Sequence, residues 1–389
     1  MSGEQQAVWL GDERDVRVDE SVVQQLLDPP RRRVLLLGDL TSDIAPVLED
    51  LGCDHVQTAP ETVVETALAM GAINAALVDP ALLATDRTMH AVADLRALYP
   101  QMRVLLAGAP HELPAELLVQ AIRGGLHDII DPTDREGLRG ALQTCLLRSE
   151  QEAERVLAIG AHPDDVEIGS AGALLEHRRR GDHVAVLTLS RGDVGGDRNA
   201  RVGESVTAAT QIGARLLLAD LPDTQIDQGI DTIRLIEAVV GALKPTVVYV
   251  HSRHDNHQDH RAVNTATMSA TRSVAQVFAY QSPSATNEFS PTRFVPIDAV
   301  VTRKVDVLSS FASQSERTYL EPELIVAGAR YWARHLAPLA RYAEPFEVIR
   351  SFIPRRAALS APAQTVLSSP GPVAPMALSA SHAFAGESA

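Results

Sequence analysis

Short apolar runs alternate with amphipathic stretches twice along this chain of 389 residues. The short runs indicate buried strands, and the helical periodicity between them, as at residues 115–123 and 202–212, indicates helices. Such alternation predicts parallel sheets with helices on both faces. The first series has its runs at residues 34–37, 75–78, 104–107 and 129–130, and the second at residues 156–160, 183–189, 216–218 and 246–250.

The two series predict two doubly wound α/β domains of three layers each. A flavodoxin-like domain is expected at residues 33–147 and a Rossmann-like domain at residues 148–354. Further strands are expected at residues 277–280 and 297–301, where the chain is again apolar. Residues 138–155 are charged and helical in pattern, so we expect a linker helix there.

Both ends of the chain differ in composition from the predicted domains. Residues 1–32 are acidic and polar and end in two prolines and a run of arginines, which indicates a flexible arm with one short helix at residues 22–27. Residues 355–389 are rich in Ala, Ser and Pro and carry almost no charge. Such a composition buries too little apolar surface to offset the entropy of ordering, so we expect a disordered tail.

Composition also excludes several kinds of partner and site. The net charge of −15, from 50 acidic and 35 basic residues, repels phosphate backbones and anionic membranes, so nucleic acid is not an expected partner. Cys53 and Cys145 are the only cysteines and form no CxxC pair, so a bound metal must use histidine and carboxylate ligands. The chain has neither a secretory signal pattern nor an apolar run of about 20 residues, so we expect a cytoplasmic protein without membrane attachment.

A polar turn follows the first apolar run of the second series. It reads Ala-His-Pro-Asp-Asp-Val-Glu-Ile-Gly at residues 161–169 and contains His162, Asp164 and Asp165. Loops at the carboxyl ends of parallel strands form the ligand crevice of open α/β sheets. Zinc accepts imidazole nitrogen and carboxylate oxygen at about 2.0–2.2 Å, and a histidine with a carboxylate three residues later can reach one ion. This turn is therefore a candidate metal-binding segment.

A second polar segment follows the fourth run of the same series. Residues 251–260 include His251, His254, His257 and His260, out of 13 histidines in the whole chain. Taken alone, each of these histidines fits a solvated loop in which aspartates cap a helix. Two independent His/Asp segments at strand ends favour a shared catalytic or metal site instead.

The two segments together resemble the PIG-L/LmbE family of zinc-dependent de-N-acetylases, which act on N-acetylglucosamine-type amides. The resemblance is carried by His162-Pro163-Asp164-Asp165 and by His257-Gln258-Asp259-His260, and it extends over about residues 154–350. Paired motifs in this order are a more specific signal than either motif alone. Other matching positions are the glycine-rich loop at residues 190–196, Arg201 with Glu204, Lys244-Pro245 and Tyr342-Ala343-Glu344.

The resemblance implies roles for the residues of both segments. It makes His257 the group that polarises or protonates the reacting amide, and Asp259 the residue that orients a histidine. His251 and His254 are expected to be loop residues or to support the ligands from behind. The implied zinc ligands are His162, Asp165 and His260, which leave one coordination position open, and the implied general base that activates water is Asp164.

Substrate contacts are expected next to the metal segment. The resemblance implies that Arg201 and Asp193 contact the substrate, whereas spacing alone equally fits a surface ion pair of Arg201 with Glu204. Many relatives have an acid directly after the Asp pair. This chain has its acid one residue later, at Glu167, which leaves the role of that residue open.

The first domain resembles a response-regulator receiver domain in strand order, with Asp79 at the position of the phosphoacceptor. Phosphoryl transfer would also need acids after the first strand, a hydroxyl after the fourth and a lysine after the fifth. At these positions the chain offers Asp39 alone, Ala107 followed by glycine, and Asp131 followed by proline. We therefore expect a pseudo-receiver that serves in docking or homodimerisation, with phosphorylation of Asp79 as the alternative.

The function that follows is zinc-dependent removal of an acetyl group from an N-acetylated sugar conjugate. Two alternatives stay open: a non-catalytic signalling or scaffold protein that acts through the receiver-like domain, and a metal phosphoesterase. A two-metal phosphoesterase needs a bridging carboxylate and more ligands than the two segments offer. Bound zinc and acetate release would distinguish the enzyme from the scaffold.

Overall fold

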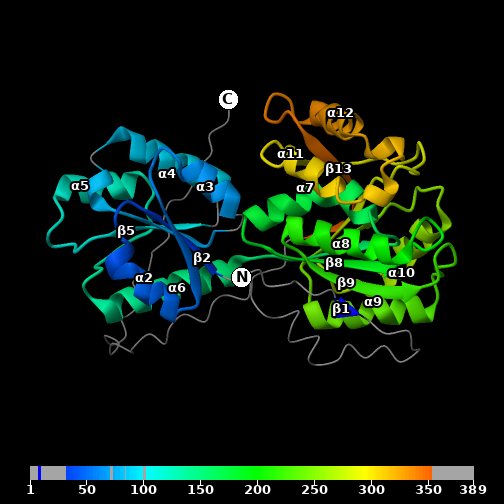
Figure 1. The fold of residues 1–389 in the computed structure, drawn as a ribbon, viewed down its shortest axis with the longest axis horizontal. Helices are drawn as coiled ribbons and strands as arrows, with labels where there is room; N and C mark the ends of the chain where they lie inside the picture. Colours follow the sequence, from blue (N-terminus) through cyan, green and yellow to red (C-terminus); the bar gives the residue numbers. More distant parts are fainter. Residues whose placement is uncertain (1–7, 10–31, 71–72, 84, 100–101, 353–389) are drawn as a thin grey trace, which may run out of the picture. The chain divides into compact units, whose positions relative to one another are not determined.

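The computed structural model describes residues 8–9, 32–70, 73–83, 85–99 and 102–352. Within these ranges the chain forms two β-sheets, each with its own layers of helices (Figure 1). The predicted α/β architecture with parallel sheets is therefore confirmed. The helix predicted at residues 22–27 and the tail predicted at residues 355–389 lie outside the described residues, and the domain boundaries stay predictions.

The smaller sheet is entirely parallel, with the order β3-β2-β4-β5-β6 in the described residues. This is the flavodoxin-like order. Helices α2 and α6 pack on one face of the sheet, and α3, α4 and α5 pack on the other. The elements are β2 Arg32–Leu37, α2 Thr41–Asp50, β3 Cys53–Thr58, α3 Val63–Met70, β4 Ala75–Val78, η1 Pro80–Leu82, α4 Asp86–Leu98, β5 Arg103–Ala107, α5 Ala115–Arg123, β6 Asp128–Ile130 and α6 Arg135–Glu152.

The larger sheet is built mainly from the second half of the chain, after α6. Its strands and helices alternate from β7 to β11, and two antiparallel strands complete it. The elements are β1 Val8–Trp9, β7 Arg155–Gly160, α7 Asp165–Arg179, β8 His183–Ser190, α8 Arg198–Ile212, β9 Arg215–Leu221, α9 Ile230–Leu243, β10 Val247–His251, α10 Gln258–Ala270, β11 Gln276–Tyr280, β12 Arg293–Pro296, α11 Val301–Leu308, η2 Ala312–Gln314, η3 Thr318–Leu320, α12 Pro322–Trp332, η4 Ala333–His335 and β13 Ala343–Ser351.

The order of strands in the larger sheet reverses beside β7. Within the described chain the order is β1-β9-β8-β7-β10-β11-β13-β12, so β8 and β9 lie on one side of β7 while β10 and β11 lie on the other. A doubly wound sheet binds its ligands at such a switch point, outside the carboxyl ends of the strands. A functional site is therefore expected in the loops after β7 and β10.

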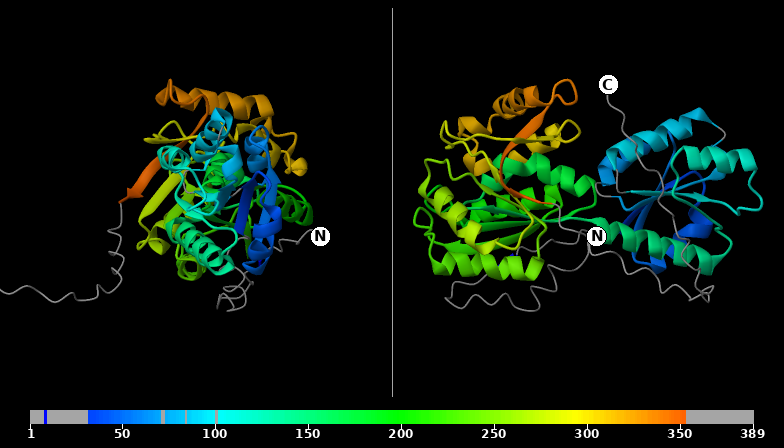
Figure 2. Two further views of the ribbon diagram at one scale, coloured as in Figure 1. Left: turned by 90° about the vertical axis from the view of Figure 1, so that its left-hand side faces the viewer. Right: turned by 180° about the vertical axis from the view of Figure 1, so that it is seen from behind.

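Side chains of β7 point alternately to the two faces of the larger sheet. Val156 and Ala158 pack in one core with α7, α8 and α11, and Leu157 and Ile159 pack in the other with α9 and α10. Figure 2 shows these layers from two further directions. Full burial of one large apolar side chain stabilises the folded state by about 1.5–3 kcal/mol. The two cores together therefore hold β7 and β10 firmly in position.

Two sequence-based expectations need correction. The apolar residues 297–301 do not form a strand: a turn closed by Val300 N–H and Ile297 O, 3.0 Å apart, leads into α11, and the strand β12 lies just before it. Ile297 and Val300 are buried all the same, because the turn packs on the core. In the predicted arm, Val8 and Trp9 form β1, which pairs in parallel with β9.

The linker helix is found as α6, which begins and ends three residues earlier than the predicted range. None of the helices in the described ranges combines the length and the apolar character that crossing a membrane requires.

Candidate metal centre and active site

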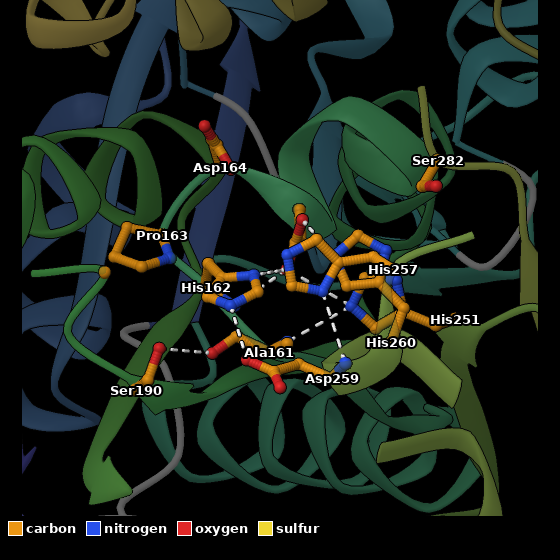
Figure 3. A network of polar contacts seen from close by, with 12 residues as sticks. Ala161, His162, Pro163, Asp164, Ser190, His251, His257, Asp259, His260 and Ser282 are labelled. Carbon is orange, nitrogen blue, oxygen red and sulfur yellow. Dashed lines mark hydrogen bonds and ion pairs between the residues drawn. The ribbon is translucent and has the colours of Figure 1, made fainter. Parts of the chain in front are cut away.

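The two histidine-rich segments follow neighbouring strands at the switch point. β7 and β10 are parallel partners, with Val156 opposite Val247. The first segment leads from β7 into α7, and the second leads from β10 into α10. Because parallel neighbours end at the same edge of the sheet, the two segments face each other, and their side chains meet in one network (Figure 3).

The three residues predicted as zinc ligands lie together. Asp165 contacts both histidines: its Oδ2 is 3.2 Å from Nδ1 of His162, and its Oδ1 is 3.3 Å from Nε2 of His260. The centroids of the two imidazole rings are 5.5 Å apart. All three side chains are buried. Asp165 thus lies between the two imidazoles, although within the described residues these three side chains are not one of the sets whose ligand atoms all lie within 4.8 Å of one another.

The other nitrogen of His162 faces two carboxylates. Nε2 lies 3.0 Å from Oδ2 of Asp259 and 3.1 Å from Oδ1 of Asp223. Although burial disfavours the charged ring, Asp165, Asp223 and Asp259 together raise the pKa of His162 well above its ordinary value. Asp259, predicted to orient a histidine, thus contacts His162.

Asp223 is a residue of the site that the sequence analysis missed. It follows β9, and Val194 N–H donates to its Oδ2 at 2.8 Å. Although burial opposes ionisation, the contact with His162 lowers the pKa of Asp223 to about 2. The sequence did contain a signal for Asp223: it is an acid just after the third strand of the second series. That strand, β9, ends at the same edge of the sheet as the two segments.

Asp255 supports His260 from behind. Its Oδ2 lies 3.0 Å from Nδ1 of His260, and the hydroxyls of Ser282 and Ser284 also donate to its carboxylate. Burial opposes the charged ring, but Asp165 and Asp255 raise the pKa of His260 to about 9. Asp255 belongs to the second segment, although no role was assigned to it from sequence. Carboxylates that fix the far nitrogen of a metal-binding histidine are common in metal sites.

His251 stacks on His260 with ring centroids 3.8 Å apart and is completely buried. Its Nε2 accepts the N–H of Ala161 at 3.1 Å and also lies 3.2 Å from Oδ2 of Asp165. Burial lowers the pKa of His251 to about 4, so the ring is neutral. Two atoms that both carry lone pairs therefore face each other, an arrangement that a cation would stabilise. His254, in contrast, is half-buried and lies beside Glu288.

The donor atoms of the site fit a metal ion. In each of three sets of side chains, the ligand atoms lie within 4.8 Å of one another. The carboxyl groups in and around these sets are buried, and burial of several anions is costly unless cations pair with them. Asp259 Oδ1 in addition is buried without a hydrogen-bond partner. The three sets are His162 with His257 and His260, Asp165 with His251 and His260, and His162 with Asp223 and Asp259.

Asp164 has an unusual backbone conformation, with φ 98° and ψ −26°. A residue other than glycine in this left-handed region costs about 1–3 kcal/mol, and such strain is typical of functional sites. Arg201 stabilises the turn, since its Nη2 donates to Oδ2 of Asp164 at 3.2 Å and also to the carbonyl of Pro163. Burial and the neighbouring Asp165 raise the pKa of Asp164 to about 7.

The glycine-rich loop wraps around Arg201. Gly192 has φ +69°, and a Cβ there would lie 2.9 Å from Cζ of the arginine. The alternative surface pairing of Arg201 with Glu204 is wrong, because Arg201 is buried while Glu204 accepts hydrogen bonds from the amide and hydroxyl of Ser313. Asp193 lies exposed on the same loop.

His257 is the most exposed of the histidines whose rings meet at the site. Its ring meets that of His162 edge-on at 4.8 Å between centroids and stacks on His260 at 4.5 Å. Burial and the two neighbouring histidines lower the pKa of His257. Glu167 is buried in the first turn of α7, where burial raises its pKa to about 8, so it is uncharged at neutral pH.

Comparison with known proteins agrees with this site. The model of the PIG-L family, described as GlcNAc-PI de-N-acetylase, matches residues 157–271. An uncharacterized deacetylase of Escherichia coli strain K12, YaiS, is 32% identical over 161 residues, which cover 39% of this chain and 87% of that protein.

Solved structures with a similar fold cover about the same part of the chain. A conserved protein of Thermus thermophilus is 24% identical with a TM-score of 0.47, over 53% of this chain and all of that one (100%). The N,N'-diacetylchitobiose deacetylase of Pyrococcus horikoshii is 18% identical with a TM-score of 0.46, over 54% of this chain and 89% of that one.

The matched residues include both site segments, and the identity to the Escherichia coli deacetylase extends over most of that protein. These relatives favour an enzyme over the non-catalytic scaffold. The chain belongs to the PIG-L family and is a hydrolytic N-deacetylase.

Proposed function

We propose that this N-deacetylase holds a zinc ion with His162, Asp165 and His260 and removes the acetyl group from an N-acetylglucosamine-type amide. The observation that carries the proposal is the convergence of these three buried side chains next to Asp164. Imidazole nitrogen with carboxylate oxygen is a donor set that zinc prefers, and three protein ligands leave room for water or substrate. When bound, zinc would polarise the acetyl carbonyl and make water more acidic.

Asp164 would act as the general base. Its pKa of about 7 is favourable for taking a proton from water near neutral pH. The hydrogen bond from Arg201 holds the carboxylate of Asp164 in one orientation. Because Asp164 directly precedes Asp165, it lies next to a proposed metal ligand. Asp164 would thus remove the proton of the attacking water as the new C–O bond forms.

His257 would serve the substrate side of the reaction. Its partial exposure lets a substrate reach the ring, whereas His162, His251 and His260 are buried. The neutral ring carries its proton on Nε2, which would donate a hydrogen bond to the amide oxygen as charge develops there, while the proton that Asp164 takes from water would pass to the departing amine. The hydrogen bond from Asp259 N–H to Nδ1 at 3.2 Å leaves Nε2 for this contact.

Substrate recognition is proposed for the loop after β8. Asp193 is exposed there and can accept hydrogen bonds from sugar hydroxyls. Arg201 lies under the loop and is buried, so its effect on the substrate would pass through Asp164 and the loop backbone rather than through open solvent.

The smaller domain is proposed to be a pseudo-receiver that docks a partner or a second copy of the chain. Asp79 follows β4, which is the third strand of the smaller sheet along the chain, and its Oδ1 accepts the N–H of Ala81 at 2.9 Å. After β6, Asp131 accepts hydrogen bonds from the amide and hydroxyl of Thr133 where a receiver would carry a lysine. A second anion at this position would oppose a phosphoryl group.

Metal analysis combined with an acetate-release screen tests the proposed activity. Purified protein should contain about one zinc per chain and release acetate from at least one N-acetylglucosamine conjugate. His260→Ala should lose both zinc and turnover. His254→Ala is the matched control, because this histidine belongs to the same segment, residues 251–260, but contacts Glu288, and it should retain both. Full activity in zinc-free protein would contradict the proposal.

A further inference from the structure

A buried ion pair contacts the middle of α7, the helix that begins with Asp165. Nζ of Lys304, from α11, lies 2.5 Å from Oε1 of Glu344, from β13, and both side chains are almost completely buried. Lys304 also donates to the carbonyl of Ile168 at 2.8 Å. Glu344 accepts the amides of Gly172 at 2.8 Å and Ala173 at 2.7 Å.

These contacts engage both ends of one hydrogen bond of the helix. In a regular α-helix the amide of Gly172 would donate to the carbonyl of Ile168, four residues earlier. Here the carbonyl of Ile168 receives Lys304, and the amide of Gly172 points at Glu344. Side chains that enter this ladder change the direction of a helix. The ion pair can therefore set the angle between the first turn of α7 and the rest of the helix.

The backbone of Ile168 links the ion pair to the turn that contains Asp164. Its N–H donates to the carbonyl of Asp164 at 2.9 Å, while its own carbonyl accepts from Lys304. From the opposite side, Arg201 holds the carboxylate of Asp164. Asp164 is thus held directly by Arg201 and, through Ile168, indirectly by Lys304.

The packing around the ion pair leaves little freedom. A Cβ on Gly172 would lie 2.8 Å from Oε1 of Glu344, and a Cβ on Gly169 would lie 2.2 Å from the ring of Tyr280. A buried ion pair is seldom more stabilising than an apolar pair of the same size, because both ions lose their hydration. Stability alone therefore does not account for charges at this position.

We infer that Lys304 and Glu344 are positioning residues, whose ion pair orients the first turn of α7 and so holds Asp164 and Asp165 in the geometry that the site requires. The inference rests on the proposed zinc-dependent function. It concerns the direction of the helix and assigns no proton transfer to either residue.

A double variant separates positioning from stability. In Lys304→Met/Glu344→Leu the side chains keep similar volumes and no charge is left buried alone, so the amide of Gly172 and the carbonyl of Ile168 have only each other as partners. We expect an unfolding temperature close to that of the wild type. Zinc affinity should fall about 10–100-fold, the usual effect of losing a residue that supports a metal ligand. kcat at saturating zinc should also fall.

His177→Gln is the matched control on the same helix. His177 lies in the last turn of α7, is buried, and bonds Asp182 at 2.6 Å and Tyr249 at 3.0 Å, but it contacts no residue of the metal site. This variant should lower the unfolding temperature and leave zinc affinity and kcat unchanged. An equal loss of zinc affinity in His177→Gln would overturn the inference, because general destabilisation would then explain both variants.

Wild-type zinc affinity and kcat in the folded double variant would also overturn it. If the double variant does not fold, Glu344→Gln decides, since the amide keeps the volume but loses one of the two acceptor oxygens; unchanged zinc affinity there would equally refute the inference. A wild-type protein that binds no zinc would instead contradict the proposed function, so the two failures are distinguishable.

Discussion

Arg201 donates a hydrogen bond to the carboxylate of Asp164 at 3.2 Å, although the two residues are 37 positions apart and lie on different helical segments. The same guanidinium donates to the carbonyl of Pro163, so it fixes both the side chain and the backbone of the turn at residues 161–165. In this position Arg201 is the cation that keeps a buried, strained aspartate in one orientation.

Asp164→Asn should retain zinc and lose most activity. Asparagine tolerates the left-handed backbone of this position and keeps the size of the side chain, but it cannot take a proton from water. General-base catalysis contributes about 10²–10⁴-fold, so kcat should fall by that factor. Metal analysis and steady-state kinetics on the same preparation measure both effects. Loss of zinc from this variant would mean that Asp164 is a ligand.

Arg201→Lys should lower kcat more than it raises KM. A lysine cannot hold the carbonyl of Pro163 and the carboxylate of Asp164 together, because it lacks the planar fork of the guanidinium. Misplacement of a catalytic group by about 1 Å can cost on the order of 10²-fold in rate. Arg198→Lys is the control, since Arg198 begins the same helix but pairs with Asp220. An unchanged kcat together with a raised KM would make Arg201 a substrate contact only.

Asp223→Asn should weaken zinc binding although Asp223 is not among the three proposed ligands. Its carboxylate faces Nε2 of His162, and loss of such a partner typically lowers metal affinity about 10–100-fold. Competition with a chelator measures the affinity. Asp227→Asn, an exposed residue of the same loop that bonds Gly229, should behave as the wild type. Equal affinities in the two variants would remove Asp223 from the site.

Asp79 should not form a stable phosphoaspartate with small phosphodonors. The positions that would supply a hydroxyl and a lysine carry Ala107 and Asp131, so nothing besides a bound Mg²⁺ would offset the charge of the phosphoryl group. Incubation with acetyl phosphate and Mg²⁺, followed by intact-mass analysis, tests this. An added phosphoryl mass that disappears in Asp79→Asn would show that the domain is an active receiver.

His177 should make the fold sensitive to acid. Burial lowers its pKa, so the folded protein keeps the ring neutral, whereas the unfolded chain protonates it near pH 6.5. The unfolded state then binds more protons as pH falls from about 6.5 toward the folded pKa, and stability drops in that window only. His177→Gln should therefore show a smaller fall in Tm between about pH 7 and pH 5. Identical slopes would assign the acid sensitivity to other groups.

The sequence was sufficient to predict that the two His/Asp segments lie together, because the proposed site residues come in two short stretches. His162, Asp164 and Asp165 are neighbours along the chain, as are His257 and His260, and each segment directly follows an apolar run. Parallel strands bring their carboxyl ends to one edge, so the meeting of the two segments could be predicted without coordinates. The same reasoning predicted both sheets, since strand and helix periodicities are local.

Tertiary structure alone decided the residues that reach the site from elsewhere. Lys304 is a single charged residue without a local motif, Asp223 is marked only by its place after a strand, and Glu344 only by the family resemblance. Each of the three acquires its partner only when distant elements pack together. The strand predicted at residues 297–301 was wrong for a related reason. An apolar run can be buried equally well in a strand or in a turn before a helix, and its periodicity does not distinguish the two. Local patterns determine which elements form, whereas long-range packing determines which isolated charges share a buried space, because that choice depends on contacts between elements far apart in sequence.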